Sequence, residues 1–514
     1  MADREENSPL AIRSGTPLTE MMGTAGESSG TTHTLATISS VGTYKRIFSL
    51  YELFCLFAVS FSYAFIFNTL TNIVIPKEVE QLAPVRQSIW VGLIMSAGAI
   101  CQLATPIVGS WSDRAAQRIP YLIYGSIVVI IGIVLFLVVG QVRNVLMLFV
   151  AHIVTTIGLS VQYAMVTALL NDHVAEEQVG KGSAVMANLA ILGSGAGYAM
   201  FATGTPLHYS LTSYILATVF CLGICVIYVP PEGIILQQQH HIKSEHPHGK
   251  TANPVPRPTT HKVDYAIVAP SADVVVGKAP ARILDFVAHA LSIPSPSRHP
   301  DFFFACLGRC LFNSGLAGQV YLVYYVRDIL GSKDAVRDTS LLSVAALLGG
   351  VVGALPSGIL SDKVGKKPVI YIAIVVCIVS LICFLMAPDV YVMQAVGFIY
   401  GCGNIAYLSV DYALGVQALP RKVVHSRDDD SDSERSTSRV PMDAAKDLGV
   451  FAMSATVGQL LGQVMYGAVL DQYSTSTPKG TTQFNHSGFV MIYGLGALFF
   501  ALSGLSTSFI RSVR

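Results

Sequence analysis

Twelve long apolar runs, separated by shorter polar segments, dominate the chain from residue 48 onward. Each run is long enough for the roughly 20 residues that cross a bilayer. Backbone groups in lipid must be hydrogen-bonded within their own segment, so each run is predicted to be a helix. The predicted spans are 48–75, 88–110, 120–140, 145–170, 180–203, 211–229, 302–326, 339–360, 368–387, 390–419, 447–470 and 488–510. The pattern predicts an all-α membrane protein with twelve transmembrane helices.

The polar segments divide these helices six to six. Residues 1–44 are rich in Ser, Thr and Gly and carry no signal peptide, which predicts a disordered cytosolic tail. Residues 230–300 are predicted to be a cytosolic linker, with a short amphipathic helix on the membrane surface at 283–291. The predicted bundles are 45–229 and 301–514, and the second contains a disordered acidic cytosolic loop at 420–446.

Two similar charged turns, at 109–120 and 358–368, show that the bundles are repeats. Asp113 in the first turn and Asp362 in the second are 249 positions apart. A repeat of this period means that the chain contains two copies of one larger unit. Further matches are Gln162–Ala164 with Asp411–Ala413 at the same offset, and Gly193 with Gly458 at an offset of 265.

Composition supports lipid as the solvent. Hydrophobic residues make up 52% of the 514 residues and charged residues only 13%, against roughly 25% charged residues in soluble domains. The net charge of +1 gives no argument for nucleic-acid binding. All nine cysteines lie in apolar runs, which argues against disulfides and a metal site. No nucleophile elbow or metal-ligand pair occurs at a span end, so we expect no enzyme activity and no cofactor.

Basic residues predict the orientation. With the amino terminus inside, 25 of the 33 Lys and Arg residues lie in cytosolic segments and seven in outer loops. Both termini are therefore predicted to be cytosolic, in the plasma membrane or an organelle membrane. The sequon at Asn485 then falls in an outer loop, where it is either a glycosylation site or an unused chance sequence.

Six plus six helices with these turns resemble the major facilitator superfamily. The family's loop signature is matched fully by the second turn, through Gly358, Asp362, Lys363, Gly365, Lys366 and Lys367. The first turn keeps Gly109, Asp113, Arg114 and Arg118 but has Ala116 where glycine is usual. Shorter stretches are similar to the branch that contains the sucrose–proton and glycoside symporters: Tyr321–Tyr325, Ser409–Leu414 and Lys446–Val450.

The resemblance implies a cytosolic gate at the two turns. In the family, the Asp that ends span two lies against the start of span eleven and stabilises the outward-open state. A carboxylate there would meet unpaired N–H groups and the positive end of the helix dipole. Asp113 would contact the start of span eleven, and Asp362 the start of span five. The basic residues would hold these contacts and bind anionic lipids, or serve only as membrane anchors: Arg114, Arg118, Lys363, Lys366 and Lys367.

Two charged residues inside spans are candidates for function, because an ionisable group in lipid is costly. Arg309 in span seven and Asp411 in span ten each lie about eight residues, or ~12 Å, from the cytosolic face. We expect them to pair, and the resemblance implies that spans one, four, seven and ten line a central cavity. Their repeat equivalents are the neutral Ser60 and Gln162. Other candidate solute contacts, each of which could instead pack between helices, are Tyr63, Asn68, Tyr163, Gln319, Tyr321 and Tyr324.

The pair suggests proton coupling. A carboxylate beside a guanidinium stays charged at neutral pH, so solute entry that disturbs the pair would let Asp411 take up a proton. A permanent structural ion pair and a proton carrier at His152 are the alternatives. The sequence thus predicts a monomeric secondary active transporter that moves a small polar solute, such as a sugar, by alternating access. A facilitative carrier, an organic-ion or drug exporter and a non-transporting membrane sensor remain open.

Overall fold

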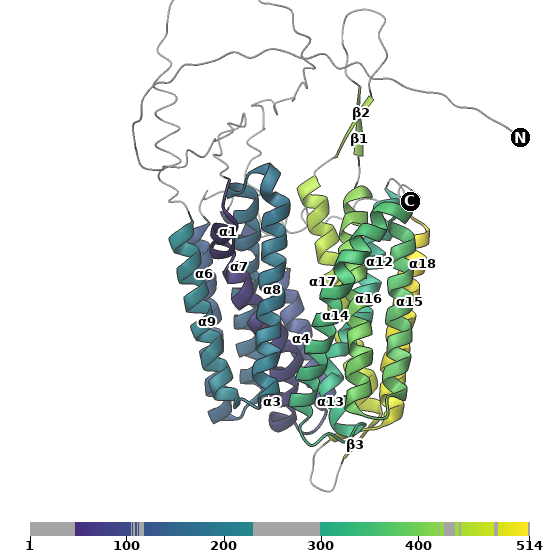
Figure 1. Cartoon of the computed structure of the whole chain (residues 1–514). Helices are drawn as coiled ribbons and strands as arrows, with labels where there is room; N and C mark the ends of the chain where they lie inside the picture. The colour runs from purple at the N-terminus through teal and green to yellow at the C-terminus, as the bar shows by residue number, and fades with distance from the viewer. Residues whose placement is uncertain are drawn as a thin grey trace, which may run out of the picture.

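The computed structural model describes residues 47–103, 105, 108–109, 111–112, 118–229, 299–419, 421–425, 437–441, 444–476 and 482–511. Several predicted features lie outside this part of the chain. They are the tail at 1–44, the surface helix at 283–291, residues 426–436 of the acidic loop, and the predicted gate residues Asp113 and Arg114. Figure 1 shows two bundles of long helices side by side.

The first bundle begins with a span made of four consecutive segments. These are α1 (Leu50–Leu56), α2 (Val59–Thr69), the π-helix η1 (Leu70–Val74) and α3 (Ile75–Leu82). The span runs past its predicted end at residue 75, because α3 continues the helix with polar residues that the apolar pattern does not include. The other helices are α4 (Gln87–Gln102), α6 (Ile119–Val142), α7 (Val145–His173), η2 (Glu176–Gln178), α8 (Val179–Ala202) and α9 (Leu207–Tyr228).

The second bundle begins with a similarly interrupted span: α12 (Pro300–Leu316), the 3₁₀ turn η3 (Ala317–Tyr321) and α13 (Leu322–Asp328). The helices that follow are α14 (Ala335–Val364), α15 (Lys366–Met386), α16 (Val390–Gln417), α17 (Ala444–Gln472) and α18 (His486–Ser508). Each of the twelve predicted spans overlaps one of these helices or one of the two interrupted spans, and the predicted all-α membrane fold is confirmed. Within the described residues, eight helical stretches are long and apolar enough to cross a membrane, with α2, η1 and α3 counted as one.

Two short hairpins lie at opposite ends of the bundles (Figure 1). Strands β1 (Arg421–His425) and β2 (Thr437–Pro441) pair in antiparallel fashion within the segment at 420–446. That this segment is a disordered loop remains a prediction. Strands β3 (Ser474–Ser476) and β4 (Thr482–Phe484) form the other hairpin, between α17 and α18.

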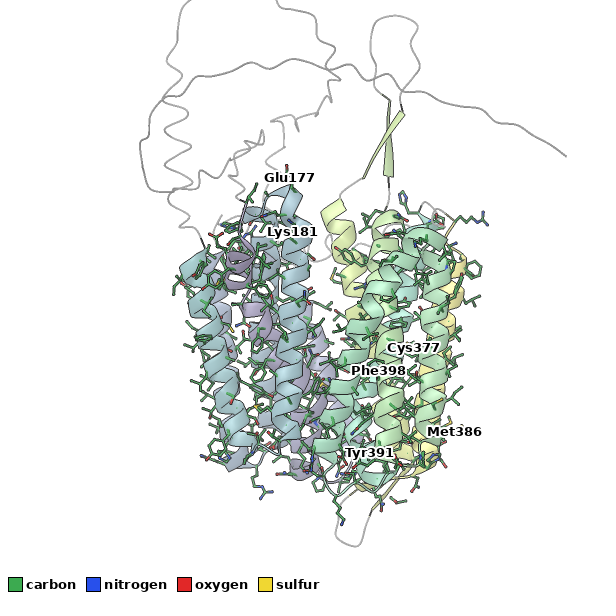
Figure 2. The ribbon with its side chains drawn as sticks, viewed as in Figure 1. Glu177, Lys181, Cys377, Met386, Tyr391 and Phe398 are labelled. Atoms are coloured by element: carbon green, nitrogen blue, oxygen red, sulfur yellow. The ribbon has the colours of Figure 1, made fainter. Side chains whose placement is uncertain are left out.

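Apolar side chains that are exposed on the outside of the bundles indicate that this surface is surrounded by lipid. Phe220 and Ile227 on α9 are 69% and 78% exposed, and a soluble monomer rarely leaves large contiguous apolar patches uncovered. Figure 2 shows Glu177 and Lys181 at one end of the bundles and Met386 and Tyr391 near the other. The chain is an integral, multi-pass membrane protein. Following the predicted orientation, we refer to the end that carries β1 and β2 as the inner end and to the end that carries β3 and β4 as the outer end.

The second charged turn needs its glycine. Gly365 joins α14 to α15 with φ +96°, a backbone conformation that strains any residue with a Cβ. The predicted turn at 358–368 is therefore a tight connection in which one helix ends and the next begins within a single residue.

The repeat is also visible in how the helices pack. A Cβ added at Gly193 on α8 would lie 2.2 Å from the carbonyl oxygen of Phe61, and one at Gly458 on α17 would lie 2.1 Å from that of Cys310. Phe61 and Cys310 are themselves 249 positions apart. Each bundle therefore uses a glycine at the same place to bring its fifth helix against the backbone of its first.

Replacing Gly458 by alanine is expected to destabilise the protein. The new methyl group would overlap the Cys310 carbonyl, and overpacking of this kind costs about 1–3 kcal/mol. Gly449 on the same helix has no atom within 4 Å of an added Cβ, so Gly449→Ala is the matched control. We expect a lower thermal unfolding midpoint in detergent for Gly458→Ala alone, and equal midpoints for both variants would contradict the close approach.

Candidate functional site

An ion pair lies inside the second bundle. The Arg309 guanidinium on α12 is 2.5 Å from the Asp411 carboxylate on α16, measured from Nη1 to Oδ2. The side chains are 16% and 3% exposed, respectively. The two charges meet at matching depth, as their positions in the sequence predict. A charge removed from water at this level is tolerated only because the other neutralises it.

The surroundings of the pair are aromatic and leave it incompletely hydrogen-bonded. Arg309 lies over the ring of Phe451 at 4.5 Å, and Tyr407 stacks on Phe312 with ring centroids 3.4 Å apart. Among the described residues, Nε of Arg309 has no hydrogen-bond partner. The contact is therefore single rather than the bidentate arrangement that makes Arg–carboxylate pairs strong. Such a pair is easier to separate than a fully satisfied one.

Aromatic rings lead from the pair toward the middle of the molecule. Tyr163 on α7 is 48% exposed and is close enough to Arg309 to interact with it electrostatically. Its ring lies 5.3 Å from that of Tyr63, which stacks on Phe67 at 5.6 Å. Tyr63 and Tyr163 thus lie next to each other on the first bundle, opposite Arg309 of the second bundle.

A cavity of about 360 Å³ lies further from the inner end, between the two bundles. It is lined by residues of α2, η1 and α8 from the first bundle and by residues of α12, η3, α13, α14, α15, α16 and α18 from the second. Its polar lining residues are Asn68, Asn72, Ser194, Tyr198, Gln319, Thr339, Ser343, Tyr400, Asn404 and Tyr493. None of the described residues that line it is an Asp, Glu, Lys, Arg or His.

The structure separates residues that the sequence analysis placed together. Of the predicted solute contacts, Asn68 and Gln319 line this cavity, but Arg309 and Asp411 do not. Asn404 and Asp411 are seven residues apart on α16, which is about 10 Å along a helix. The expectation of one cavity that contains both the charge pair and the neutral contacts is therefore not met in this cavity.

Gln162 and Ser60, the neutral residues that correspond to Asp411 and Arg309 in the repeat, lie within the first bundle and do not line the cavity. Gln162 is fully buried and donates to Ser126 Oγ at 2.9 Å, which ties α7 to α6. Ser60 is buried on α2 and is not a lining residue. His152, the alternative proton carrier, is buried with its ring against Gly98 of α4. These side chains pack helices together inside the first bundle.

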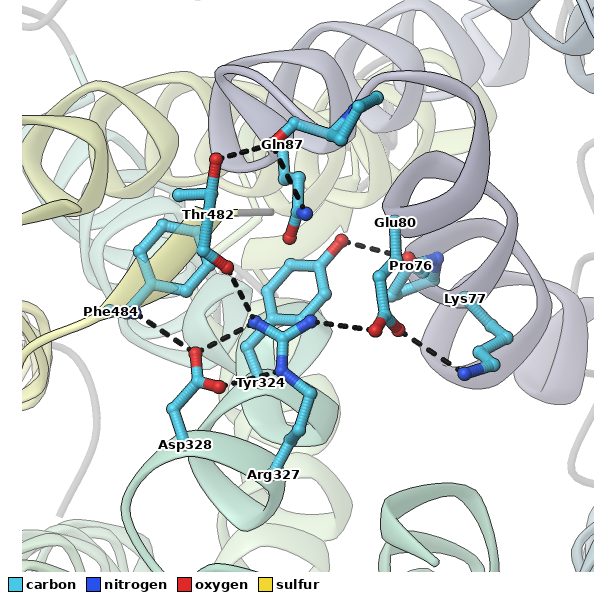
Figure 3. A network of polar contacts seen from close by, with 10 residues as sticks. Pro76, Lys77, Glu80, Gln87, Tyr324, Arg327, Asp328, Thr482 and Phe484 are labelled. Atoms are coloured by element: carbon cyan, nitrogen blue, oxygen red, sulfur yellow. Dashed lines mark hydrogen bonds and ion pairs between the residues drawn. The ribbon is translucent and has the colours of Figure 1, made fainter. Parts of the chain in front are cut away.

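Tyr324, predicted as a solute contact, instead belongs to a network that joins the bundles at the β3–β4 end (Figure 3). Its hydroxyl donates to the Pro76 carbonyl at 2.8 Å. Arg327 pairs with Glu80 of the first bundle at 3.0 Å and with its neighbour Asp328 at 2.6 Å. We call the residues of this network the outer lock: Glu80, Tyr324, Arg327, Asp328 and Thr482.

The hairpin strand β4 completes the outer lock. Thr482 hydrogen-bonds the Pro84 carbonyl and accepts from Arg327 through its own carbonyl at 3.2 Å. The Asp328 carboxylate accepts from the Phe484 backbone N–H at 3.0 Å. Deeper in the molecule, the Tyr321 hydroxyl donates to the backbone carbonyls of Ser88 on α4 and Gln463 on α17. These contacts hold the two bundles closed against each other at the outer end.

The residues that were predicted to form the cytosolic gate contact their own bundles in this structure. Arg118 pairs with Asp172 at 2.6 Å, and Lys366 donates to the Ala413 carbonyl at 2.9 Å. Lys367 donates to the Ile510 carbonyl at the end of the second bundle. Asp362 is exposed, and within the described residues no hydrogen bond joins it to α8. The predicted contact of Asp362 with the start of span five remains a prediction, for a state in which the outer end is open.

Loss of the Glu80 charge is expected to loosen the outer lock. Glu80→Gln removes the ion pair between the bundles, and a partly exposed pair contributes about 1 kcal/mol, which corresponds to about a fivefold shift toward the outward-open state. Ser88 is fully buried at this interface, so Ser88→Cys should react faster with an impermeant maleimide in the Glu80→Gln background. Lys77 contacts Glu80 within one helix, so Lys77→Gln is the control and should leave the labelling rate unchanged.

Neither the outer lock nor most of the cavity follows from the hydropathy pattern. The predicted span seven ends at residue 326, because only apolar runs mark the spans, yet Arg327 lies in the last turn of α13 with its side chain 20% exposed. Asn404 and Tyr493 look like ordinary polar residues within helices. For Asn404 there is one signal that it could line the cavity. It lies on the same helix as Asp411, on the side of that helix that faces the other bundle. Asn485 is exposed and directly precedes α18 at the outer end, as its N-cap residue. Its glycosylation remains a prediction.

Comparisons with known proteins agree with this architecture. The family model described as Major Facilitator Superfamily matches residues 53–426. The structure of the nucleoside transporter NupG is similar, with a TM-score of 0.60, 14% identity, and coverage of 89% of this chain and 99% of that one. A D-xylose-proton symporter has a TM-score of 0.59 and 13% identity, over 90% of this chain and 98% of that one.

A bacterial homolog of the human lysosomal transporter Spinster, in an inward-facing and unoccupied conformation, is similar with a TM-score of 0.52 and 13% identity. The match covers 90% of this chain and 97% of that one. At these identities the likeness to solved structures shows the fold alone. No curated protein sequence matches the chain.

Proposed function

Because this chain belongs to the major facilitator superfamily, we propose that it is a secondary active transporter that moves a small polar solute by alternating access and is driven by protons. The observation that carries the proposal is the buried, singly bonded pair of Arg309 and Asp411. A protonatable carboxylate inside a membrane span is expensive, and such groups occur where ions or protons move.

The pair suits a proton-coupling role better than a purely structural one. A pair that only joins two helices gains most when every donor is satisfied, whereas Nε of Arg309 has no partner among the described residues. Protonation of Asp411 would remove the charge that holds Arg309 and would free α12 from α16. Both helices continue toward the cavity, through η3 and Asn404, so this release can change the shape of the solute site.

The outer lock supplies the second element of alternating access. Its residues come from both bundles and keep the outer end closed in this structure. Opening that end requires Glu80 and Arg327 to part, while the inner turns close. The ion pair of Asp411 with Arg309 and the contacts of the outer lock lie at different depths, so the proton site and the gate can change state one after the other.

The similar solved structures support a small polar solute as the cargo. Two of them are described as a nucleoside transporter and a D-xylose-proton symporter, and the amide-rich and hydroxyl-rich cavity of this chain suits solutes of that polarity. A sugar is therefore the cargo we propose for the first assays.

Flux into proteoliposomes tests the proposal. Purified protein is reconstituted, and uptake of labelled sugars is measured with an inward proton gradient and again without one. Accumulation above the external concentration only with the gradient is the result we expect. Equilibration without accumulation would identify a facilitative carrier, and binding without any flux would identify a sensor; either result contradicts the proposal.

A further inference from the structure

Helices α4 and α17, one from each bundle, meet through their backbones. A Cβ added at Gly92 on α4 would lie 2.7 Å from the Gln463 carbonyl oxygen of α17. In the same way, a Cβ added at Gly467 on α17 would lie 2.6 Å from the Ser88 carbonyl oxygen of α4. Contacts this short leave no room for a side chain at either glycine. The two bundles can approach to this distance only because a glycine lies opposite a carbonyl on both sides.

The Tyr321 hydroxyl of the second bundle fills the space between the two glycines. Its oxygen would lie 3.0 Å from a Cβ added at Gly92 and 2.7 Å from one added at Gly467. It donates to the Gln463 carbonyl at 2.9 Å and to the Ser88 carbonyl at 3.2 Å. A phenol has one proton to donate, so carbonyl oxygens from both bundles share a single donor. We call these five residues the clasp: Ser88, Gly92, Tyr321, Gln463 and Gly467.

The clasp is connected to the cavity through the turn η3. Tyr321, which was predicted to contact the solute, is the last residue of η3 and is 1% exposed. Gly318 and Gln319 of the same turn line the cavity, and Gln319 donates to the Tyr400 hydroxyl on α16 at 3.2 Å. Conversion of the five residues of this 3₁₀ turn into α-helix would rotate its end by about 100°. The position of the Tyr321 hydroxyl therefore depends on the conformation of η3.

Among the described residues, the second interface between the bundles, of α8 with α14, has no equivalent of the clasp. By the offset of 249, Gly92 corresponds to Leu341 and Tyr321 corresponds to Asn72. A leucine cannot provide the space that a glycine leaves. Asn72 instead donates to the Tyr198 hydroxyl of α8 at 2.9 Å, beside the cavity. The clasp is thus specific to the α4–α17 interface and does not follow from the repeat.

From these observations we infer that Tyr321 is a positioning residue for alternating access, whose hydroxyl keeps the outer end closed while η3 holds it between α4 and α17. A rearrangement of η3 withdraws the hydroxyl and leaves the Ser88 and Gln463 carbonyls without their shared donor. Buried acceptors without a donor are unfavourable, so the interface then opens and water supplies the missing hydrogen bonds. The inference rests on the proposed alternating access and adds the element that connects the cavity to the outer end.

Removal of the Tyr321 hydroxyl tests the clasp. Gln87 at the start of α4 is fully buried, so the maleimide reactivity of Gln87→Cys in purified full-length protein reports opening of the outer end. The labelling of the nine native cysteines is subtracted. We expect Tyr321→Phe to raise the rate about fivefold or more, because two carbonyls lose their donor.

Tyr466→Phe is the matched control for this variant. Tyr466 lies on α17 and is 1% exposed, and its hydroxyl has no partner among the described residues. Loss of this hydroxyl should leave the labelling rate of Gln87→Cys unchanged. Equal rates in Tyr321→Phe and Tyr466→Phe would overturn the inference.

A second reporter separates the clasp from a general loss of stability. Thr167 lies one turn beyond Tyr163 on α7, toward the inner end, so Thr167→Cys reports access from that end. Alternating access closes the inner end when the outer end opens. In the Tyr321→Phe background we therefore expect Thr167→Cys to react more slowly. Faster labelling at both reporters would indicate destabilisation and would contradict the positioning role.

Two further variants act on the clasp without changing Tyr321. Gly467→Ala places a methyl group against the hydroxyl, and we expect faster labelling of Gln87→Cys. Gly449→Ala is its control, since no atom lies within 4 Å of a Cβ added there. Gln319→Met removes the hydrogen bond that holds η3 to α16, and we expect an increase of about twofold to fivefold. A wild-type rate in Gly467→Ala would contradict the close contact, and a wild-type rate in Gln319→Met would contradict control by η3.

These results separate the inference from the proposed function, because labelling is measured without solute and without a proton gradient. The expected labelling changes without proton-driven accumulation in the wild type would support the clasp and contradict the proposed function. Proton-driven accumulation in the wild type, with Tyr321→Phe labelled at the wild-type rate, would support the proposed function and contradict the clasp.

Discussion

Replacing Arg309 by leucine is expected to lower the free energy of unfolding by about 3–5 kcal/mol, the usual cost of removing one partner of a buried ion pair. Asp411 is 3% exposed and has Arg309 as its ion-pair partner, so the substitution would leave a buried carboxylate without a counter-charge. The loss should be smaller in acidic buffer, because a protonated carboxyl group needs no counter-charge. The thermal unfolding midpoint in detergent, measured at neutral and acidic pH, checks this result.

Two double variants separate the charge effect from simple loss of packing. Arg309→Leu combined with Asp411→Asn should recover most of the lost stability, because no buried charge remains. Exchange of the charges, Arg309→Asp with Asp411→Arg, should restore folding but not transport, since the protonatable group then lies on the other helix. Restored transport in the exchanged variant would mean that the pair is structural only.

Asp411→Asn leaves Arg309 without its counter-charge and is expected to lower stability, and in the folded protein it should abolish proton-driven accumulation while solute exchange continues. Asparagine keeps the shape of the side chain but cannot take up a proton, so the solute and proton movements become independent. With one proton per solute, a gradient of one pH unit supports roughly tenfold accumulation in the wild type, since one unit corresponds to about 1.4 kcal/mol. The variant should only equilibrate the solute across the membrane.

The control for this variant lies on the same helix. Asp389 caps the start of α16 by accepting from the Val392 backbone N–H at 2.8 Å, and it is exposed. Asparagine caps helices about as well as aspartate. Asp389→Asn should therefore accumulate solute as the wild type does. Loss of accumulation in both variants would show that the effect of Asp411→Asn is not specific to the buried pair.

The sequence predicted the architecture because lipid imposes a strong and simple constraint on the chain. Apolar runs long enough to cross a bilayer must be helices, and each predicted run overlaps a helix or an interrupted span of the structure. The repeat also has a physical basis, since Gly193 and Gly458 make the same close approach to Phe61 and Cys310, which are 249 positions apart. The pairing of Arg309 with Asp411 followed from their equal depth.

The cavity and the outer lock could not be predicted by the same reasoning. Hydropathy identifies which residues are polar but not which face of a buried helix they occupy, so Tyr324 in the outer lock and Tyr493 in the cavity look alike in the sequence. The breaks at η1 and η3 also rotate the residues beyond them relative to a continuous helix. Gln162, which is equivalent to Asp411 in the repeat, has no charged partner among the described residues of the first bundle and donates to Ser126 instead.

Solute-induced proton movement tests the central claim most directly. Proteoliposomes that contain a pH-sensitive dye are prepared without any pH gradient, and a solute shown to bind is added outside. If Asp411 couples the two fluxes, the interior of wild-type vesicles acidifies when the solute is added, and that of Asp411→Asn vesicles does not. Acidification of equal rate in the wild type and in Asp411→Asn would contradict the account.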